Sequence, residues 1–209
     1  MSINIIELFV MDNCQICPQM ERLFERMHQN GAFNELKIVN IGNHPEVAEK
    51  NNIRSVPYYL INDIGFSGLK TQHEIMTLLQ QGEVDRWQEF LKSELSEGVL
   101  KEAEVAIIEN SSAREAMMLL LDDINTTLVV RIGLSAIIET VAESGLLNDY
   151  ENHFISLASQ QDERIAIDAI YYLSLLATKS SLHKLREIAE NGAEQLKSHA
   201  EEVLQDLEN

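Results

Sequence analysis

The chain contains little proline and cysteine. Its 209 residues include three prolines, nine glycines and two cysteines. Two cysteines are too few for the disulfide framework on which small secreted domains rely. No apolar run approaches the roughly 18 residues that a membrane-spanning helix needs. Because no proline follows Pro57, the remainder of the chain favours helices with few interruptions.

Basic residues are scarce as well: 16 Lys and Arg stand against 34 Asp and Glu, giving a net charge of −18. Nucleic acids and anionic membranes attract clustered Lys and Arg, so we expect neither as a partner. Residues 1–95 hold 8 basic and 13 acidic residues (net −5), and residues 96–209 hold 8 and 21 (net −13). The two halves therefore differ in character. An acidic second half favours solubility or selects a basic partner.

The first half alternates between strand and helix patterns. Short apolar or β-branched runs predict strands at 3–10, 35–41, 56–62 and 64–68. Apolar residues three and four apart predict a helix from Cys17 to about Asn30, and later helices follow at 44–52, 71–81 and 84–95. The order β-α-β-α-β-β-α predicts a mixed sheet. Helical crossovers make its first strands parallel, and a turn makes the last two antiparallel.

Beyond Gly98 the pattern is helical throughout. The predicted helices lie at about 99–109, 112–122, 127–144, 150–160, 162–178, 181–191 and 194–207. Small residues recur at Gly133, Ala166 and Ala200, with offsets of 33 and 34 residues. Stacked helix pairs show such periods, and small residues let two helix backbones approach closely. This half resembles HEAT-type helical repeats, although a plain helical bundle shares much of the pattern.

The stretch "MDNCQICPQM" holds both cysteines, Cys14 and Cys17, at the junction of a predicted strand and helix. The free N–H groups and dipole of a helix N-terminus stabilise a thiolate, and this spacing puts the second sulfur within reach of the first. We interpret the pair as a redox couple in which Cys14 attacks and Cys17 resolves. Two inert buried thiols and half of a metal site are the alternatives. A structural zinc site needs four ligands, and the six histidines show no short paired spacing.

With "CQICP" before the first helix and "SVP" before the third strand, residues 1–95 resemble the thioredoxin fold. The form "CQICP" is similar to glutaredoxin-like members, such as archaeal small redox proteins and a domain of the alkyl hydroperoxide reductase flavoprotein. The resemblance implies that Cys14 is the exposed nucleophile and Cys17 the resolving thiol. It also implies that Pro57 is a cis-proline facing the pair and that the backbone of Val56 binds a substrate chain.

Two features depart from typical thioredoxins. Asn13 stands where those proteins have tryptophan, and the only tryptophan, Trp87, lies far along the chain. The buried acid that helps to deprotonate the resolving thiol has no obvious counterpart, and Glu7 is the nearest candidate on a predicted strand. The site is therefore an atypical member of its kind.

Together these patterns predict an α/β thioredoxin-like redox domain at 1–96 and an all-α HEAT-like docking domain at 97–209. We expect a thiol-disulfide oxidoreductase that acts on a protein disulfide with an unidentified electron donor, no metal and no cofactor beyond its own dithiol. The helical domain would dock a protein partner or form a homodimer. A redox-sensing scaffold with little turnover is an alternative, and metal or metalloid binding through the cysteines is another. The first ten residues lack the basic segment of a secretory signal, so we expect a cytoplasmic protein.

Overall fold

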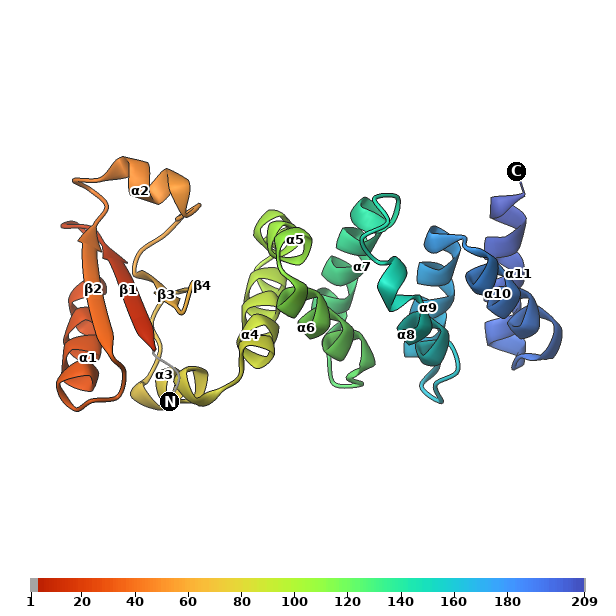
Figure 1. Cartoon of the computed structure of the whole chain (residues 1–209), viewed down its shortest axis with the longest axis horizontal. Helices are drawn as coiled ribbons and strands as arrows, with labels where there is room; N and C mark the ends of the chain where they lie inside the picture. The colour runs from red at the N-terminus through yellow and green to blue at the C-terminus, as the bar shows by residue number, and fades with distance from the viewer. Residues whose placement is uncertain (1–3, 209) are drawn as a thin grey trace. The chain divides into compact units, whose positions relative to one another are not determined.

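The structure, a computed structural model, describes residues 4–208 (Figure 1). These residues form two compact units that divide between Phe90 and Leu91. Helix α4 (Glu83–Ser96) runs across this division. Within the described range, no helix combines the length and the apolar character required to cross a bilayer.

The first unit is a four-stranded mixed sheet with helices. Its elements are β1 (Ile5–Val10), α1 (Cys17–Gln29), β2 (Glu35–Asn40), α2 (Pro45–Lys50), β3 (Tyr58–Ile61), β4 (Ile64–Ser67) and α3 (Gln72–Gln80). The strands lie in the order β2-β1-β3-β4. Strand β1 is parallel to β2, and β3 is antiparallel to both of its neighbours. The predicted element order and mixed sheet are confirmed.

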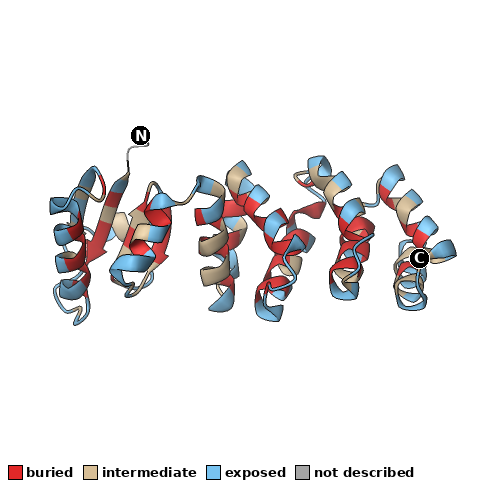
Figure 2. Cartoon of the chain, turned by 90° about the horizontal axis from the view of Figure 1, so that it is seen from below, coloured by how far each residue is buried: buried red, intermediate tan, exposed pale blue. Residues whose placement is uncertain are grey.

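The core of this unit covers both faces of the sheet, because the neighbouring residues Leu8 and Phe9 of β1 are both buried. In the pairing of β1 with β3, Ile6 stands opposite Ile61 and Leu8 opposite Tyr59, and all four side chains are fully buried. Helix α1 supplies the apolar stripe that its spacing predicted, visible as buried turns in Figure 2. Its Phe24 ring meets the Tyr59 ring edge-on, with centroids 5.1 Å apart. This packing fixes the end of β1 relative to the start of α1.

The second unit is helical. It contains the end of α4, then α5 (Leu100–Glu109), α6 (Ser111–Asp122), α7 (Leu128–Ala142), the 3-10 helix η1 (Asn148–Tyr150), α8 (Glu151–Leu157), α9 (Glu163–Leu176), α10 (Lys179–Asn191) and α11 (Glu194–Leu207). As predicted, this stretch has no strand in the part that the structure describes. The segment predicted as a helix at 150–160 is shorter, because α8 ends at Leu157.

The helices of the second unit are stacked side by side (Figure 1). Helices α5, α7, α9 and α11 each pack against the next member of that series. Helix α6 packs against α5 and α7, α8 against α9, and α10 against both α9 and α11. Each added helix pair therefore buries its apolar side against its neighbours, as stacked repeats do.

The small residues that recur in the sequence lie at these helix contacts. A Cβ atom built on Gly133 of α7 would come within 2.8 Å of the Cδ2 atom of Leu95. Ala166 of α9 and Ala200 of α11 are fully buried. A larger side chain at Gly133 would have to displace Leu95, because packed interiors have little free volume.

Polar side chains also join α7 to α9. The buried Arg131 donates from Nε and Nη2 to Asp168 Oδ2, at 2.9 and 2.7 Å, and from Nη1 to the carbonyl of Leu121 at 3.2 Å. One turn along, the hydroxyls of Ser135 and Tyr172 lie 2.7 Å apart. Burial raises the pKa of Tyr172 to about 12, so this phenol stays protonated at neutral pH. The two contacts fix the register between the helices.

Glu151, the first residue of α8, closes the N-terminus of α10. Its Oε1 atom accepts hydrogen bonds from the Thr178 hydroxyl, from the Ser181 hydroxyl at 2.7 Å and from the Ser181 N–H at 2.9 Å. Burial raises the pKa of Glu151, but the hydrogen bonds from Thr178 and Ser181 outweigh burial and leave the pKa below its usual value. The ionised carboxylate is therefore the form that the fold favours.

We predict that Glu151→Gln lowers the free energy of unfolding by about 1–2 kcal/mol at pH 7, because hydrogen bonds to a charged acceptor become neutral ones. A carboxylate with a depressed folded-state pKa adds stability above its unfolded pKa and loses it as the pH falls through the folded one. The difference from wild type should therefore close in acid. Urea unfolding followed by circular dichroism at a series of pH values measures this, with the exposed Glu190→Gln as control. A gap that persists at low pH would contradict the assignment.

We also predict that Gly133→Leu lowers the free energy of unfolding by about 1–3 kcal/mol, because the new side chain overpacks the contact with Leu95. The half-buried Ala136 lies on the same helix, and Ala136→Leu is the matched control. Thermal unfolding of both variants checks the prediction. Equal melting temperatures would show that α7 does not depend on close approach at Gly133.

Candidate redox site

The two cysteines form a disulfide between the end of β1 and the start of α1. Cys17 is the first residue of α1, Cys14 lies three residues before it, and their Cα atoms are 5.4 Å apart. Because the two cysteines are bonded to each other, they are not the two separate buried thiols that were the alternative interpretation. The structure places the pair at the junction of a strand and a helix, as the sequence predicted.

The two sulfur-bearing residues differ in exposure. Cys14 is half-buried, whereas Cys17 is only 1% exposed. An external molecule therefore reaches the Cys14 side chain more easily than that of Cys17. This asymmetry is what a couple with one attacking and one resolving thiol requires.

A backbone donor points at the sulfur of Cys14. The N–H of Cys17 donates to Cys14 Sγ at 3.0 Å. The N-cap residue of α1, Ile16, has no side-chain acceptor, so the Cys14 sulfur stands in the role that a Ser or Asp oxygen has at many helix starts. After reduction the same N–H and the helix dipole would stabilise negative charge on that sulfur.

Val56 and Pro57 lie beside Cys14, although they are far from it in the sequence. The carbonyl oxygen of Val56 is 3.6 Å from Cys14 Sγ, and the Val56–Pro57 peptide bond is cis. A disulfide sulfur carries no proton, so this contact becomes a hydrogen bond only when Cys14 is a thiol. The Pro57 carbonyl accepts the N–H of Gly68 at 2.9 Å, which ties this loop to the end of β4. The structure therefore brings together all four residues predicted for the site.

Exposed apolar side chains accompany the disulfide. Met11 precedes Cys14 and Ile16 lies between the two cysteines, and both side chains are exposed. The Cys14 N–H donates to the Met11 carbonyl at 3.1 Å. Leu69 is also exposed and follows Gly68, the residue bound to Pro57. Leu69 was missed because only the fold brings the end of β4 to the Pro57 loop.

Glu7, the candidate acid for Cys17, is engaged elsewhere. It stands opposite Lys37 of β2, and its Oε1 atom forms an ion pair with Lys37 Nζ at 3.0 Å. This pair links two neighbouring strands across the surface of the sheet. Glu7 therefore acts as a cross-strand partner, as charged pairs on sheets commonly do.

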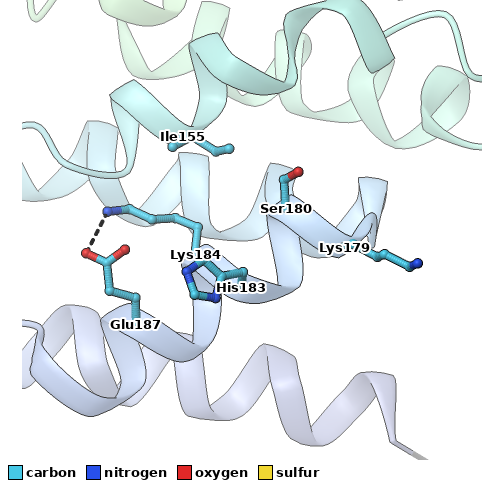
Figure 3. A pocket seen from close by; sticks show the side chains of 6 residues that line it. All are labelled: Ile155, Lys179, Ser180, His183, Lys184 and Glu187. Atoms are coloured by element: carbon cyan, nitrogen blue, oxygen red, sulfur yellow. Dashed lines mark hydrogen bonds and ion pairs between the residues drawn. The ribbon is translucent and has the colours of Figure 1, made fainter.

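The second unit has a pocket on α8 and α10. It has a volume of about 420 Å³ and is lined by Ile155, Lys179, Ser180, His183, Lys184 and Glu187. Figure 3 shows Lys184 turned toward Glu187, with Nζ and Oε1 3.3 Å apart. Because this pair cancels part of the positive charge, the pocket has no strong electrostatic preference. The functional assignment therefore rests on the disulfide.

Between residues 4 and 208 there is no group of three or more His, Cys, Asp or Glu side chains that could hold a metal ion. No protein-family model matches the chain, and no curated protein matches its sequence.

We predict that, in the reduced protein, iodoacetamide modifies Cys14 at least about tenfold faster than Cys17, because Cys14 is more accessible than the buried Cys17 and its thiolate has an N–H donor. Quenching at timed intervals, followed by peptide mass spectrometry, gives both rates. The Cys17→Ser variant is the control for Cys14 alone. Faster modification of Cys17 would reverse the order of attack.

Proposed function

We propose that the protein is a thiol-disulfide oxidoreductase with a thioredoxin-like first domain and the Cys14–Cys17 couple as its reactive centre. One arrangement carries this proposal: a disulfide at a helix start, with its accessible sulfur next to the cis Val56–Pro57 peptide. The mixed sheet, its strand order and the helix after the cysteines are consistent with that fold.

The reaction is a two-step thiol-disulfide exchange. The Cys14 thiolate attacks one sulfur of a substrate disulfide, forms a mixed disulfide and releases the other substrate sulfur as a thiolate. The Cys17 thiolate then attacks the Cys14 sulfur, forms the Cys14–Cys17 disulfide and releases the second substrate thiol. The substrate gains two electrons and two protons. An external dithiol donor returns the pair to the reduced state and is itself oxidised to a disulfide.

The substrate that best fits this site is a polypeptide disulfide. The Val56 backbone beside Cys14 is suited to pairing with an extended chain, and the exposed Met11, Ile16 and Leu69 offer apolar contact. Reduction is the expected direction in the cytoplasm, the compartment that we propose, where thiols are kept reduced.

The second domain would contribute a docking surface built from HEAT-type repeats. The stacked helices, with small residues at their contacts, support this reading. Repeat arrays generally present extended surfaces to other proteins. A homodimer formed through the helices is the alternative use of such a surface.

A redox-sensing interaction protein is the second candidate, because the same couple is joined to a helical unit with exposed apolar side chains. In that case the disulfide would control binding, with little turnover. Purifying partners with wild type and with the Cys14→Ser/Cys17→Ser double variant distinguishes the two. A changed partner set for the double variant, together with little disulfide reduction by wild type, favours the redox-sensing protein, whereas an unchanged partner set contradicts it.

We predict that Cys14→Ser reduces the dithiothreitol-driven reduction of insulin disulfides by at least about 100-fold, since the attacking thiolate is lost. Reduced Cys17→Ser, mixed with insulin after dithiothreitol has been removed, should retain the attack but accumulate a mixed disulfide at Cys14, because no thiol is left to resolve it. A turbidity assay and non-reducing mass spectrometry provide the two readouts. The exposed Ser180→Ala is a control. Equal activity of wild type and Cys14→Ser would end the proposal.

A further inference from the structure

The first half of α7 and the connection before it expose a cluster of large aliphatic side chains, here called the α7 patch. Its members are Ile124, 58% exposed, Leu128, 71%, Val129, 55%, and Ile132, 60%. Surface residues of this type are common singly, but four that are more than half exposed within nine positions form a concentrated apolar surface.

Three of these side chains, those of Leu128, Val129 and Ile132, are on the exposed side of α7, whose buried side is also apolar. Leu128 and Ile132 are four positions apart and share a face, whereas Val130, Leu134 and Ile137 are buried against the unit. A helix on the surface of a protein normally has a polar outer face, and one that is apolar on both faces is typical of a helix covered on both. The composition of α7 therefore indicates that something covers the patch.

The charges around the patch indicate what that partner is. From Arg114 to Arg164 the sequence has nine Asp and Glu against three Arg, and Lys92 lies near Asp123, which precedes Ile124. Arg114 donates to the carbonyls of Ile107 and Ile108, and Arg164 pairs with Asp162. Arg131 is buried and paired with Asp168, so it presents no cationic surface. A second copy of this chain would place acid against acid around the contact, which is unfavourable. A partner with basic residues around an apolar centre would be attracted.

We propose that the α7 patch binds an amphipathic helix of another protein, whose apolar face is flanked by Lys and Arg. The Leu128–Ile132 ridge has the four-residue spacing that packs into the groove of a facing helix. The inference rests on the proposed function only for a further step, in which this partner carries the disulfide to be reduced. Binding of the helix to the patch does not require the thiol chemistry and is measured separately.

The probe is a fluorescein-labelled peptide of 18 residues with Leu at helical spacing and Lys elsewhere. Fluorescence anisotropy against the full chain should give saturable binding that weakens with salt. Leu128→Asp and Ile132→Asp should each weaken it at least about tenfold, as expected for central apolar contacts. Leu207→Asp makes the same change at an exposed leucine outside the patch and should leave binding unchanged. All three variants should keep the wild-type melting temperature, because the side chains are exposed.

The Asp variants separate apolar docking from general attraction of a cationic peptide to an acidic protein. Each adds a negative charge, so purely electrostatic binding would be equal or tighter. A peptide of the same composition with Leu scrambled out of helical spacing, and one with Glu in place of Lys, should both bind at least about tenfold more weakly. Equal binding of the scrambled peptide, or undiminished binding by Leu128→Asp, would overturn the proposal.

Sedimentation velocity tests whether a second copy of this chain covers the patch instead. A wild-type dimer that Ile132→Asp converts to a monomer would assign the patch to a second copy and overturn the proposal; a monomer in both supports it. The experiments can overturn the proposed peptide binding and the proposed oxidoreductase activity independently of each other. Absence of peptide binding by a wild-type protein that reduces insulin overturns only the patch. Peptide binding by a wild-type protein that reduces no disulfide overturns only the oxidoreductase.

Discussion

The hydrogen bond from the Cys17 N–H to the Cys14 sulfur is the interaction on which the account of this protein depends. It exists because α1 begins at Cys17, with its first N–H groups free, and because Cys14 lies just ahead of them. The position of α1 depends in turn on its packing against the sheet. The Phe24 ring of α1 against Tyr59 of β3 holds the helix on the sheet. The reactive loop is thus supported by a rigid core, as precise chemistry requires.

The helical unit is held together by both close packing and buried polar contacts. Its contacts combine close packing of the Leu95 side chain on Gly133 with a few buried polar contacts, such as Arg131 with Asp168. A buried arginine is costly unless its hydrogen bonds are satisfied, so this contact specifies the register of α7 on α9 more than it adds stability. The same helix leaves Leu128 and Ile132 uncovered. Stability and recognition therefore use opposite faces of one helix.

Much of the fold could be predicted from sequence because local signals mark its elements. The turn at Asn62 and Asp63 has the left-handed backbone that these residues tolerate, and Gly31 ends the first helix with a φ of 72°. The proximity of Val56 to Cys14 could be predicted only by analogy with a known fold. What local patterns could not give are contacts set by tertiary packing. The exposed half of α7 looked like any buried apolar helix, and nothing near Leu69 in sequence indicated that the fold brings it to the Pro57 loop.

The most direct measurement of the central claim is a redox titration of Cys14 and Cys17. The protein is equilibrated with mixtures of reduced and oxidised dithiothreitol, alkylated, and weighed by mass spectrometry. If Cys14 and Cys17 are a redox couple, there is one transition, in which both thiols appear together and the ratio of reduced to oxidised protein changes tenfold for each roughly 30 mV of a two-electron couple. Thiols that appear independently, or that stay reduced across the whole range, would contradict it.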